Sequence, residues 1–272
     1  MPSGVKLGEA KAGPANIRLG LQASFATILE ATQGCLAQAG LPFRDMSRIT
    51  ACLALAGASE PMELAAAQRL KFPFRHTMIT TDAKAACVGA HHGRDGGVVV
   101  VGTGSIGWAE YRGRQHRVGG WGSVLSDEGS GAWLGRELLV RVLWACDGRI
   151  EKTTLLNEAF EQFHCDPHSV VRWASKAAPR DFGALAPLVV EHGWRGDAVG
   201  RDLMSRAGAH ADALAMRLVA LGVDRLALVG GLAEPMRSWI SASTEARLVA
   251  PAGDALDGAL QLARTIAESV AA

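Results

Sequence analysis

The chain has 272 residues, of which 49% are hydrophobic, so it can bury a large core as one domain or as two lobes. Its net charge of +1 gives neither the basic surface that binds nucleic acid nor an attraction to anionic membranes. Its apolar runs are strand-sized, far short of the roughly 20 residues of a membrane span, and residues 1–13 lack the apolar core of a signal peptide. We therefore expect a soluble cytoplasmic protein.

The five cysteines indicate neither a disulfide framework nor a metal site. None of them forms a C-x-x-C pair or lies near histidines at the spacing of zinc ligands. We expect buried, reduced thiols that pack as small hydrophobic side chains. The cysteines are Cys35, Cys52, Cys87, Cys146 and Cys165.

The first third of the chain alternates helical and extended segments. Ala- and Leu-rich stretches predict helices, and short runs rich in β-branched residues predict strands. In chain order we expect a helix over Ile17–Ala39, a strand over Ile49–Ala56, a helix over Met62–Leu70, a strand over His76–Thr80 and a helix over Asp82–His91.

The rest of the chain continues this alternation around a long helical insertion, predicted over Glu151–Leu221. The continuous valines of Val98–Val101 predict a strand that is buried on both faces. Further strands are expected at Arg225–Val229 and Arg247–Ala250, and a last helix over Asp254–Ala271. Strands separated by helices of this size predict α/β layers around a mostly parallel sheet.

The stretch VVVVGTGSIGW places Gly102, Gly104 and Gly107 in the G-x-G-x-x-G pattern of dinucleotide-binding loops. That pattern needs a helix at the third glycine, which would aim backbone N–H groups at a pyrophosphate. The residues after Gly107 instead alternate apolar and polar, with a turn at Arg112–Gly113, and predict a β-hairpin. The remaining alternatives are an anion-binding turn around Thr103 and an ordinary glycine-rich hairpin turn.

Asp82 stands between a predicted strand and an Ala-rich helix. A carboxylate there is either the N-cap of the helix or a general base at the carboxyl end of a parallel strand, where α/β proteins place their sites. Taken as an isolated aspartate, the residue is better explained as an N-cap.

Two later stretches add possible ligand contacts. Six glycines within VGGWGSVLSDEGSGAWLGRELL cost considerable folding entropy, which favours a functional loop over a structural one. Carboxylate and backbone groups of such a loop bind hydroxyls, and the ring of Trp121 can cover an apolar face, so a polyhydroxylated ligand is indicated. In LALVGGLAEP, the turn at Gly230 and Gly231 would let a flat base or ribose lie against the backbone.

In chain order the sequence carries GPANIR, ACLALAG, ITTDAKAA, VVVVGTGS, GGWG followed by SDEGSG, and LVGG. With this order and spacing, the chain resembles the N-acetylglucosamine kinases of the BadF/BadG-type ATPase group, within the actin-like, hexokinase-like ATPase superfamily. The resemblance covers nearly the whole chain and implies a two-lobed, ribonuclease H-like α/β fold. It implies an N-terminal lobe over residues 1–95, on which a helix over 255–272 packs, and a C-terminal lobe over 96–254 with the helical insertion.

The resemblance also implies a reaction, the ATP-dependent phosphorylation of N-acetylglucosamine or glucosamine at the 6-hydroxyl. Asp82 matches the base that accepts the proton of that hydroxyl. Mg²⁺ would accompany ATP without a ligand fixed by the match, and a homodimer with no nucleic-acid or membrane partner is implied. The matching sugar-contacting positions are Asn16, Asp82, Ser105, Gly120, Trp121, Gly122 and Asp127, and the matching ATP-binding positions are Gly102, Thr103, Gly104, Gly230 and Gly231.

The sequence departs from this family at its start. Family members begin with a strand and a D-G-G-G-T hairpin, the first phosphate loop, whereas the opening VKLGEAKAGPANIR resembles the segment after that hairpin. We expect an N-terminal lobe without its first strands, through truncation or a misplaced start rather than natural loss. A naturally reduced chain would bind ATP weakly and expose a sheet edge.

Two other functions stay open beside the kinase. A non-catalytic sugar-binding protein would explain the missing first phosphate loop. A BadF-type ATPase that activates a dehydratase would need paired cysteines for an iron–sulfur cluster, and the five cysteines offer no convincing pair.

Overall fold

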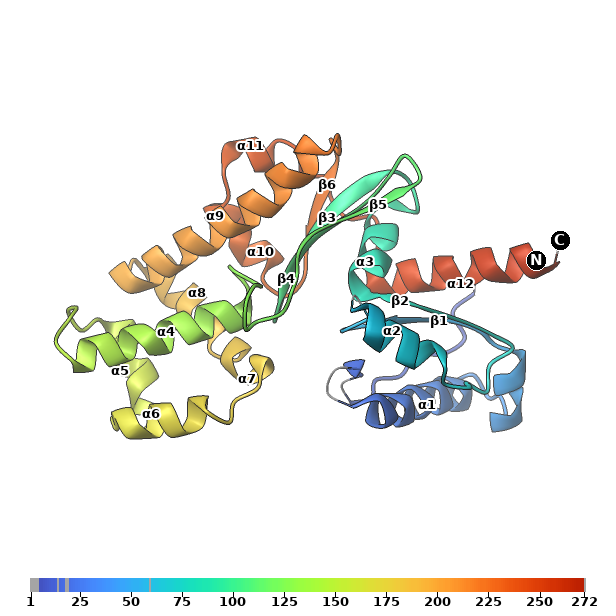
Figure 1. Ribbon diagram of the computed structural model, residues 1–272, viewed down its shortest axis with the longest axis horizontal. Helices are drawn as coiled ribbons and strands as arrows, with labels where there is room; N and C mark the ends of the chain where they lie inside the picture. The colour runs from blue at the N-terminus through green and yellow to red at the C-terminus, as the bar shows by residue number, and fades with distance from the viewer. Residues whose placement is uncertain (1–4, 14, 18–19, 59, 272) are drawn as a thin grey trace. The chain divides into compact units, whose positions relative to one another are not determined.

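The computed structural model describes residues 5–13, 15–17, 20–58 and 60–271 (Figure 1). The chain forms two compact units. The first unit comprises Met1–Gly93 together with Ala252–Ala272, and the second unit comprises Arg94–Pro251. Among the described residues, no helix combines the length and the apolar composition that crossing a membrane requires.

The described part of the first unit contains a sheet of two parallel strands, β1 (Thr50–Leu55) and β2 (His76–Thr81). Their register pairs Leu55 with Thr81, so both strands end at the same sheet edge. Whatever follows either strand therefore lies at this carboxyl edge, where open α/β sheets bind ligands.

In the described part of the first unit, helices and a 3₁₀ segment accompany this sheet. Helix α3 packs so closely on α12 that both helices need glycine at the contact. A Cβ at Gly89 of α3 would collide with the backbone of Asp254, and one at Gly258 of α12 would collide with the backbone of Ala85. The segments are α1 (Leu21–Gln38), η2 (Phe43–Arg48), α2 (Pro61–Gln68), α3 (Asp82–His91) and α12 (Ala255–Ala271).

The second unit is built on a four-stranded mixed sheet in the order β5-β4-β3-β6. Strands β3 (Gly96–Val101), β4 (Ser105–Tyr111) and β5 (Arg114–Gly119) are antiparallel neighbours, and β6 (Leu226–Val229) runs parallel to β3. The valines of β3 are almost all buried, as their continuous run predicts. The predicted hairpin is confirmed, whereas the prediction of a mostly parallel sheet is wrong for this unit, because the hairpin adds two antiparallel pairings.

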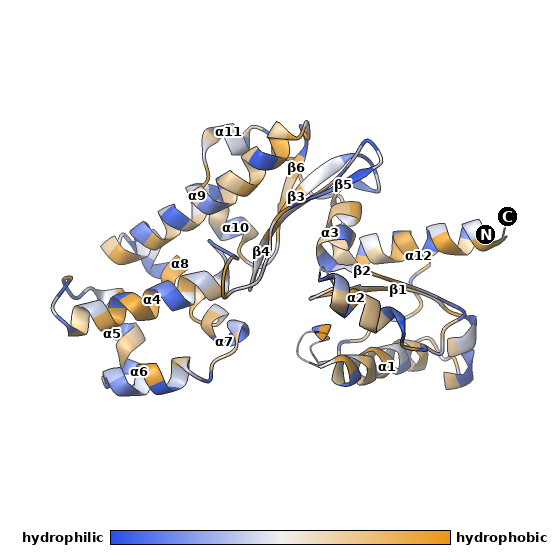
Figure 2. Ribbon diagram, in the orientation of Figure 1, coloured by the Kyte–Doolittle hydropathy of each residue, from blue (hydrophilic) through white to orange (hydrophobic). Residues whose placement is uncertain are grey.

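The expected helical insertion is confirmed in the second unit. Helices α4 and α9 carry interleaved apolar and polar residues, so each can bury one side against the core (Figure 2). The helices are α4 (Gly131–Cys146), α5 (Thr154–Glu161), α6 (Pro167–Ala174), α7 (Pro179–Gly183), α8 (Ala186–Arg195), α9 (Ala198–Ala220), α10 (Ala233–Met236) and α11 (Ala242–Glu245), with a 3₁₀ turn, η3, at Arg237–Trp239.

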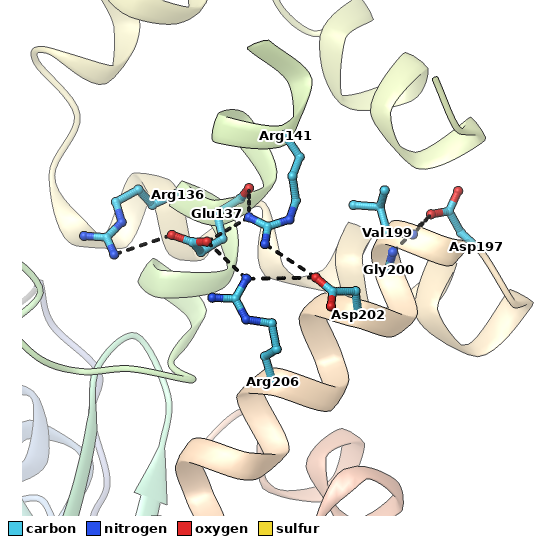
Figure 3. Close-up of polar contacts among 8 residues, drawn as sticks. All are labelled: Arg136, Glu137, Arg141, Asp197, Val199, Gly200, Asp202 and Arg206. Atoms are coloured by element: carbon cyan, nitrogen blue, oxygen red, sulfur yellow. Dashed lines mark hydrogen bonds and ion pairs between the residues drawn. The ribbon is translucent and has the colours of Figure 1, made fainter. Parts of the chain in front are cut away.

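A network of ion pairs joins α4 to α9 (Figure 3). The almost buried guanidinium of Arg141 lies 2.7 Å from Glu137 of its own helix and 3.4 Å from Asp202 of α9. Arg206 of α9 reaches the same Glu137 carboxylate at 3.6 Å. Because a buried charge is costly without partners, this network fixes how the two helices pair.

Three local predictions are wrong. Helix α1 begins at Leu21 rather than at Ile17, which lies in a short 3₁₀ turn. The segment Arg247–Ala250 forms only a bridge between Leu248 and Leu226, and the chain leaves the sheet at Pro251, which has no N–H to donate. The cysteines are not all buried, since Cys146 and Cys165 are exposed.

Candidate functional site

The turn between β3 and β4 is held from two sides. The N–H of Gly102 donates to the carbonyl of Gly104 at 2.9 Å, which closes the turn. The first N–H groups of α4 are used by this turn, since Gly131 donates to the carbonyl of Gly102 (2.8 Å) and Ala132 to that of Thr103 (3.1 Å). The turn is therefore preorganised, and the side chain of Thr103 is exposed at its tip.

The two glycines of this turn differ in what surrounds them. Neither has a positive φ, so neither is required for its backbone angles. At Gly104 an added Cβ would lie 2.7 Å from a carboxylate oxygen of Asp127, whereas at Gly102 it would meet nothing within 4 Å. Gly104 thus allows Asp127 to approach, and Gly102 leaves open space beside the backbone.

The turn at Gly230 and Gly231 lies at the same edge of the sheet. Strand β6 ends beside β3, with Val229 paired to Val100, and the N–H of Leu232 then donates to the carbonyl of Val101 at 3.0 Å. Gly230 has a φ of +105°, and an added Cβ would collide with that carbonyl. The two glycine turns proposed to bind ATP are thereby brought together.

The loop after β5 is a run of left-handed glycines. Gly119, Gly120 and Gly122 have φ values of +66°, +69° and +105°, a region that other residues rarely adopt. An added Cβ at Gly120 would lie only 2.6 Å from the side chain of Ile106. Trp121, between these glycines, has 64% of its surface exposed. The left-handed backbone of this loop therefore requires glycine, and it leaves the side-chain ring of Trp121 largely exposed.

Asp127 and Ser105 connect the glycine loop to the turn of Gly104. The carboxylate of Asp127 accepts from the N–H of Gly122 at 3.1 Å and lies next to Gly104. The buried hydroxyl of Ser105 donates to the carbonyl of Glu128 at 2.8 Å. Ser105 thus holds the neighbouring chain in place, and its proton is already engaged.

In the first unit, Asn16 and Asp82 occupy the carboxyl edge of the β1–β2 sheet. Ile17, next to Asn16, donates its N–H to the carbonyl of Ala56, just beyond β1, at 3.2 Å. Asp82 directly follows the last residue of β2. Because the two strands are parallel and in register, Asp82 at the end of β2 and the segment of Asn16 beside the end of β1 lie at the same sheet edge.

The N-cap interpretation of Asp82 is wrong. The cap of α3 is Thr81, whose hydroxyl accepts from the N–H of Lys84 at 3.0 Å, and Asp82 is the first helical residue. A carboxylate oxygen of Asp82 accepts from the N–H of Ala83 at 2.9 Å. With capping already provided by its neighbour, Asp82 is not required for that role.

The electrostatic surroundings of Asp82 suit proton transfer. Its side chain keeps contact with solvent, but the surrounding protein removes part of the hydration that stabilises the charged form. This desolvation raises the pKa of the Asp82 carboxyl above its ordinary value of 3.8, and the backbone N–H of Ala83 partly opposes the shift. A carboxylate with a raised pKa is a better proton acceptor.

The predicted residues thus fall into two groups. Asn16 and Asp82 lie in the first unit, and all the others lie in the second, where the turns at Gly102 and Gly230 share one sheet edge. Within the described part of the chain, no three His, Cys, Asp or Glu side chains cluster as metal ligands. The sequence-based prediction did not include Arg117. The available signal was its position two residues before Gly119 in an extended strand, which places both residues on one face of the strand.

Comparison with known proteins identifies a family and several similar proteins. A family model described as the BadF/BadG/BcrA/BcrD ATPase family matches residues 2–259. The chain is 36% identical over 257 residues to glucosamine kinase GspK of Vibrio cholerae, which covers 94% of this chain and 87% of that protein. A solved structure assigned as an N-acetylglucosamine kinase, from Chromobacterium violaceum, has a TM-score of 0.89 and 34% identity over 94% of this chain and 90% of that one.

A more distant solved structure bears on the fold alone. A ROK-family glucokinase from Streptomyces griseus matches 93% of this chain and 88% of its own, with a TM-score of 0.52 and 14% identity. Together the matches confirm the expected mixed α/β fold of the actin-like ATPases.

Proposed function

This chain belongs to the BadF/BadG/BcrA/BcrD ATPase family, and on that premise we propose that it transfers a phosphoryl group from ATP to the 6-hydroxyl of an amino sugar. Its identity to a glucosamine kinase supports a sugar kinase in the broad sense. The proposal therefore concerns the identity of the amino sugar, the hydroxyl that reacts and the residues that bind and react.

One observation carries the proposal most strongly, the meeting of two glycine turns at one sheet edge. The turn at Gly102 is closed by its own hydrogen bond and by the start of α4, and the turn at Gly230 lies directly beside β3. Rigid backbone turns with open space next to them suit a nucleotide, because phosphates bind preorganised backbone groups. We assign Gly102, Thr103 and Gly104 to the phosphates and Gly230 and Gly231 to the adenosine.

Phosphoryl transfer requires positioned reactants, neutralised phosphate charge and a base near the attacking hydroxyl. ATP, carried with Mg²⁺, supplies the phosphoryl group when bound, and we assign no side chain to the metal. Asp82 accepts the proton of the sugar hydroxyl, a role that its raised pKa and solvent contact support. Asn16, whose neighbour Ile17 is hydrogen-bonded to the chain just beyond β1, binds the sugar.

We assign the other sugar-contacting positions to the glycine loop of the second unit. Its backbone at Gly120 and Gly122 and the Asp127 carboxylate offer hydrogen-bonding groups to sugar hydroxyls. The exposed ring of Trp121 offers an apolar surface to a sugar face or an acetyl methyl group. Ser105 contributes its hydroxyl oxygen as an acceptor, while its O–H donates to the Glu128 carbonyl.

The choice of amino sugar is tested by a substrate panel. Purified protein with ATP and Mg²⁺ is offered glucosamine, N-acetylglucosamine, glucose or no sugar, and ADP release is followed by a coupled assay. We expect at least one amino sugar to raise the rate about tenfold or more over glucose and over the sugar-free reaction. Equal ADP release with and without sugar would contradict a kinase, and sugar binding in calorimetry without ADP release would indicate a non-catalytic binding protein.

A further inference from the structure

Arg117 contacts three consecutive residues of the loop that carries Trp121. Its Nε donates to the carbonyl of Gly119 at 3.1 Å, and its Nη2 donates to the carbonyl of Gly120 at 2.5 Å. Its Cζ atom lies 3.9 Å from the centroid of the Trp121 ring, well within the range of a cation–π contact. One side chain therefore contacts both the backbone and the ring of this loop.

Backbone hydrogen bonds close the tip of the loop, where the N–H groups of Leu125 and Ser126 donate to the carbonyl of Gly122 at 3.2 and 2.8 Å. Gly119 and Gly120 are consecutive left-handed glycines, which lose more conformational freedom on ordering than other residues do. Beyond them, Val124 and Leu125 are 86% and 87% exposed, so little packing fixes the tip of the loop. On the far side, Asp127 accepts from the N–H of Gly122. The polar contacts of Arg117 and Asp127 thus tether the loop from both sides.

The chemistry of arginine suits this task. The guanidinium is a planar, rigid fork of donors that also stacks on aromatic rings, whereas a lysine offers a point charge on a flexible stem. Arg117 is itself anchored, because it belongs to β5 and pairs in the ladder with Trp108 of β4. Its half-buried side chain therefore connects the loop to a regular sheet.

We propose that Arg117 is a positioning residue of the sugar site, which holds Gly120 and Trp121 in the conformation that the sugar meets. The guanidinium also covers one face of the Trp121 ring, so a sugar must approach the other face or the ring edge. This inference rests on the proposed function for its ligand, but the geometry of the loop is independent of any ligand.

The test compares R117K and R117M with wild type, and uses R114K as the matched control. Arg114 lies on the same strand with an exposed side chain and is placed outside the site. Two measurements are made on the full chain: amide hydrogen exchange of the peptide spanning residues 119–125, and the KM values for the amino sugar and for ATP. If there is no turnover, sugar Kd from calorimetry replaces KM.

We expect both Arg117 variants to exchange faster in this peptide and to raise the KM for the sugar about tenfold, the equivalent of roughly 1.4 kcal/mol of binding. The KM for ATP and the melting temperature should stay close to those of wild type and R114K. A purely structural role would instead lower the melting temperature and change both KM values together.

Either of two results overturns the inference. Unchanged exchange in R117K shows that Arg117 does not hold the loop, whatever the activity. Faster exchange with an unchanged KM or Kd for the sugar shows that the sugar does not use the loop that Arg117 holds. Failure of the proposed function is a separate result, because it appears in the wild type as ADP release that no sugar raises.

Discussion

The two sheet edges that carry the candidate residues are built in different ways. At the edge of the first unit, the candidate groups are side chains, Asn16 and Asp82, at the carboxyl ends of short, mostly half-buried strands. At the edge of the second unit, they are mainly backbone groups in glycine turns, tied by hydrogen bonds to α4, β3 and Asp127. One edge offers a titratable group, and the other offers a fixed surface.

This difference follows from what each half of the proposed reaction needs. A base must change its protonation state, so it requires a side chain whose pKa the surroundings can shift, as desolvation does for Asp82. Phosphates and sugar hydroxyls are held best by groups that do not rearrange, so a rigid backbone suits them. Substitutions at the first edge should therefore act mainly on chemistry, whereas those at the second edge should act on binding, on stability or on both, according to the space beside each residue.

The largest expected effect comes from Asp82→Asn. The amide cannot accept the proton, and a general base contributes typically a factor of about 10² to 10⁴, so kcat for sugar phosphorylation should fall by about that factor. Because ionised Asp82 is poorly solvated, the melting temperature should stay the same or rise. Activity and thermal unfolding are measured beside Asp224→Asn, an exposed control. Retained activity in D82N would remove Asp82 from the chemistry.

A matched pair of glycine substitutions separates folding from nucleotide binding at the second edge. In Gly104→Ala, the new methyl group meets Asp127 at 2.7 Å, so overpacking should lower the free energy of unfolding by about 1–3 kcal/mol. In Gly102→Ala the methyl group enters open space, so stability should change by less than about 0.5 kcal/mol while the KM for ATP rises. Urea unfolding and ATP titration measure both, and an unchanged KM for ATP in G102A would place the phosphates elsewhere.

A loss of stability of similar size to that of Gly104→Ala is expected for Ser105→Ala. Its hydroxyl is the donor to the Glu128 carbonyl in a buried position, and leaving that carbonyl unpaired costs about 1–3 kcal/mol of unfolding free energy. The melting temperature should fall by several degrees, whereas Ser123→Ala in the nearby loop should leave it unchanged. A rise in the KM for sugar without any loss of stability would instead make Ser105 a sugar contact alone.

The smallest expected effect is the pH dependence of stability that comes from Asp82. Its pKa is raised in the folded protein, so the folded state binds the proton more tightly than the unfolded chain does. The unfolding free energy of wild type relative to D82N should therefore increase as the pH falls through the raised pKa toward 3.8, and decrease as the pH rises. Urea unfolding of both proteins across this range measures it, and the opposite slope would contradict a desolvated Asp82.

Patterns that depend on neighbouring residues were predictable from the sequence. The valine run gave β3, and the alternation after Gly107 gave the hairpin that excludes a dinucleotide loop. The strand–Asp82–helix order placed the carboxylate at a sheet edge, but the local pattern favoured an N-cap, which the structure contradicts. Thr81 and Asp82 are both common cap residues, and only the backbone geometry tells which one caps the helix.

Features that depend on contacts distant in sequence could not be predicted. A side chain at position 104 would collide with the carboxylate of Asp127, and one at position 230 would collide with a carbonyl of β3. Neither requirement for glycine can be seen from the neighbouring residues in the sequence. The contacts of Arg117 with the glycine loop need the register of β5 as well as the left-handed turn that follows it. The bridge at Leu248 depends on the same kind of long-range pairing.

The most direct test of the account identifies the product. Wild type and D82N are incubated with ATP, Mg²⁺ and the amino sugar that the panel selects, and the products are followed by phosphorus NMR with coupling to the sugar protons. The account predicts a phosphate ester coupled to the C6 protons, formed by wild type and lost in D82N. A phosphate at another carbon, inorganic phosphate as the only product, or an equal yield from D82N would contradict it.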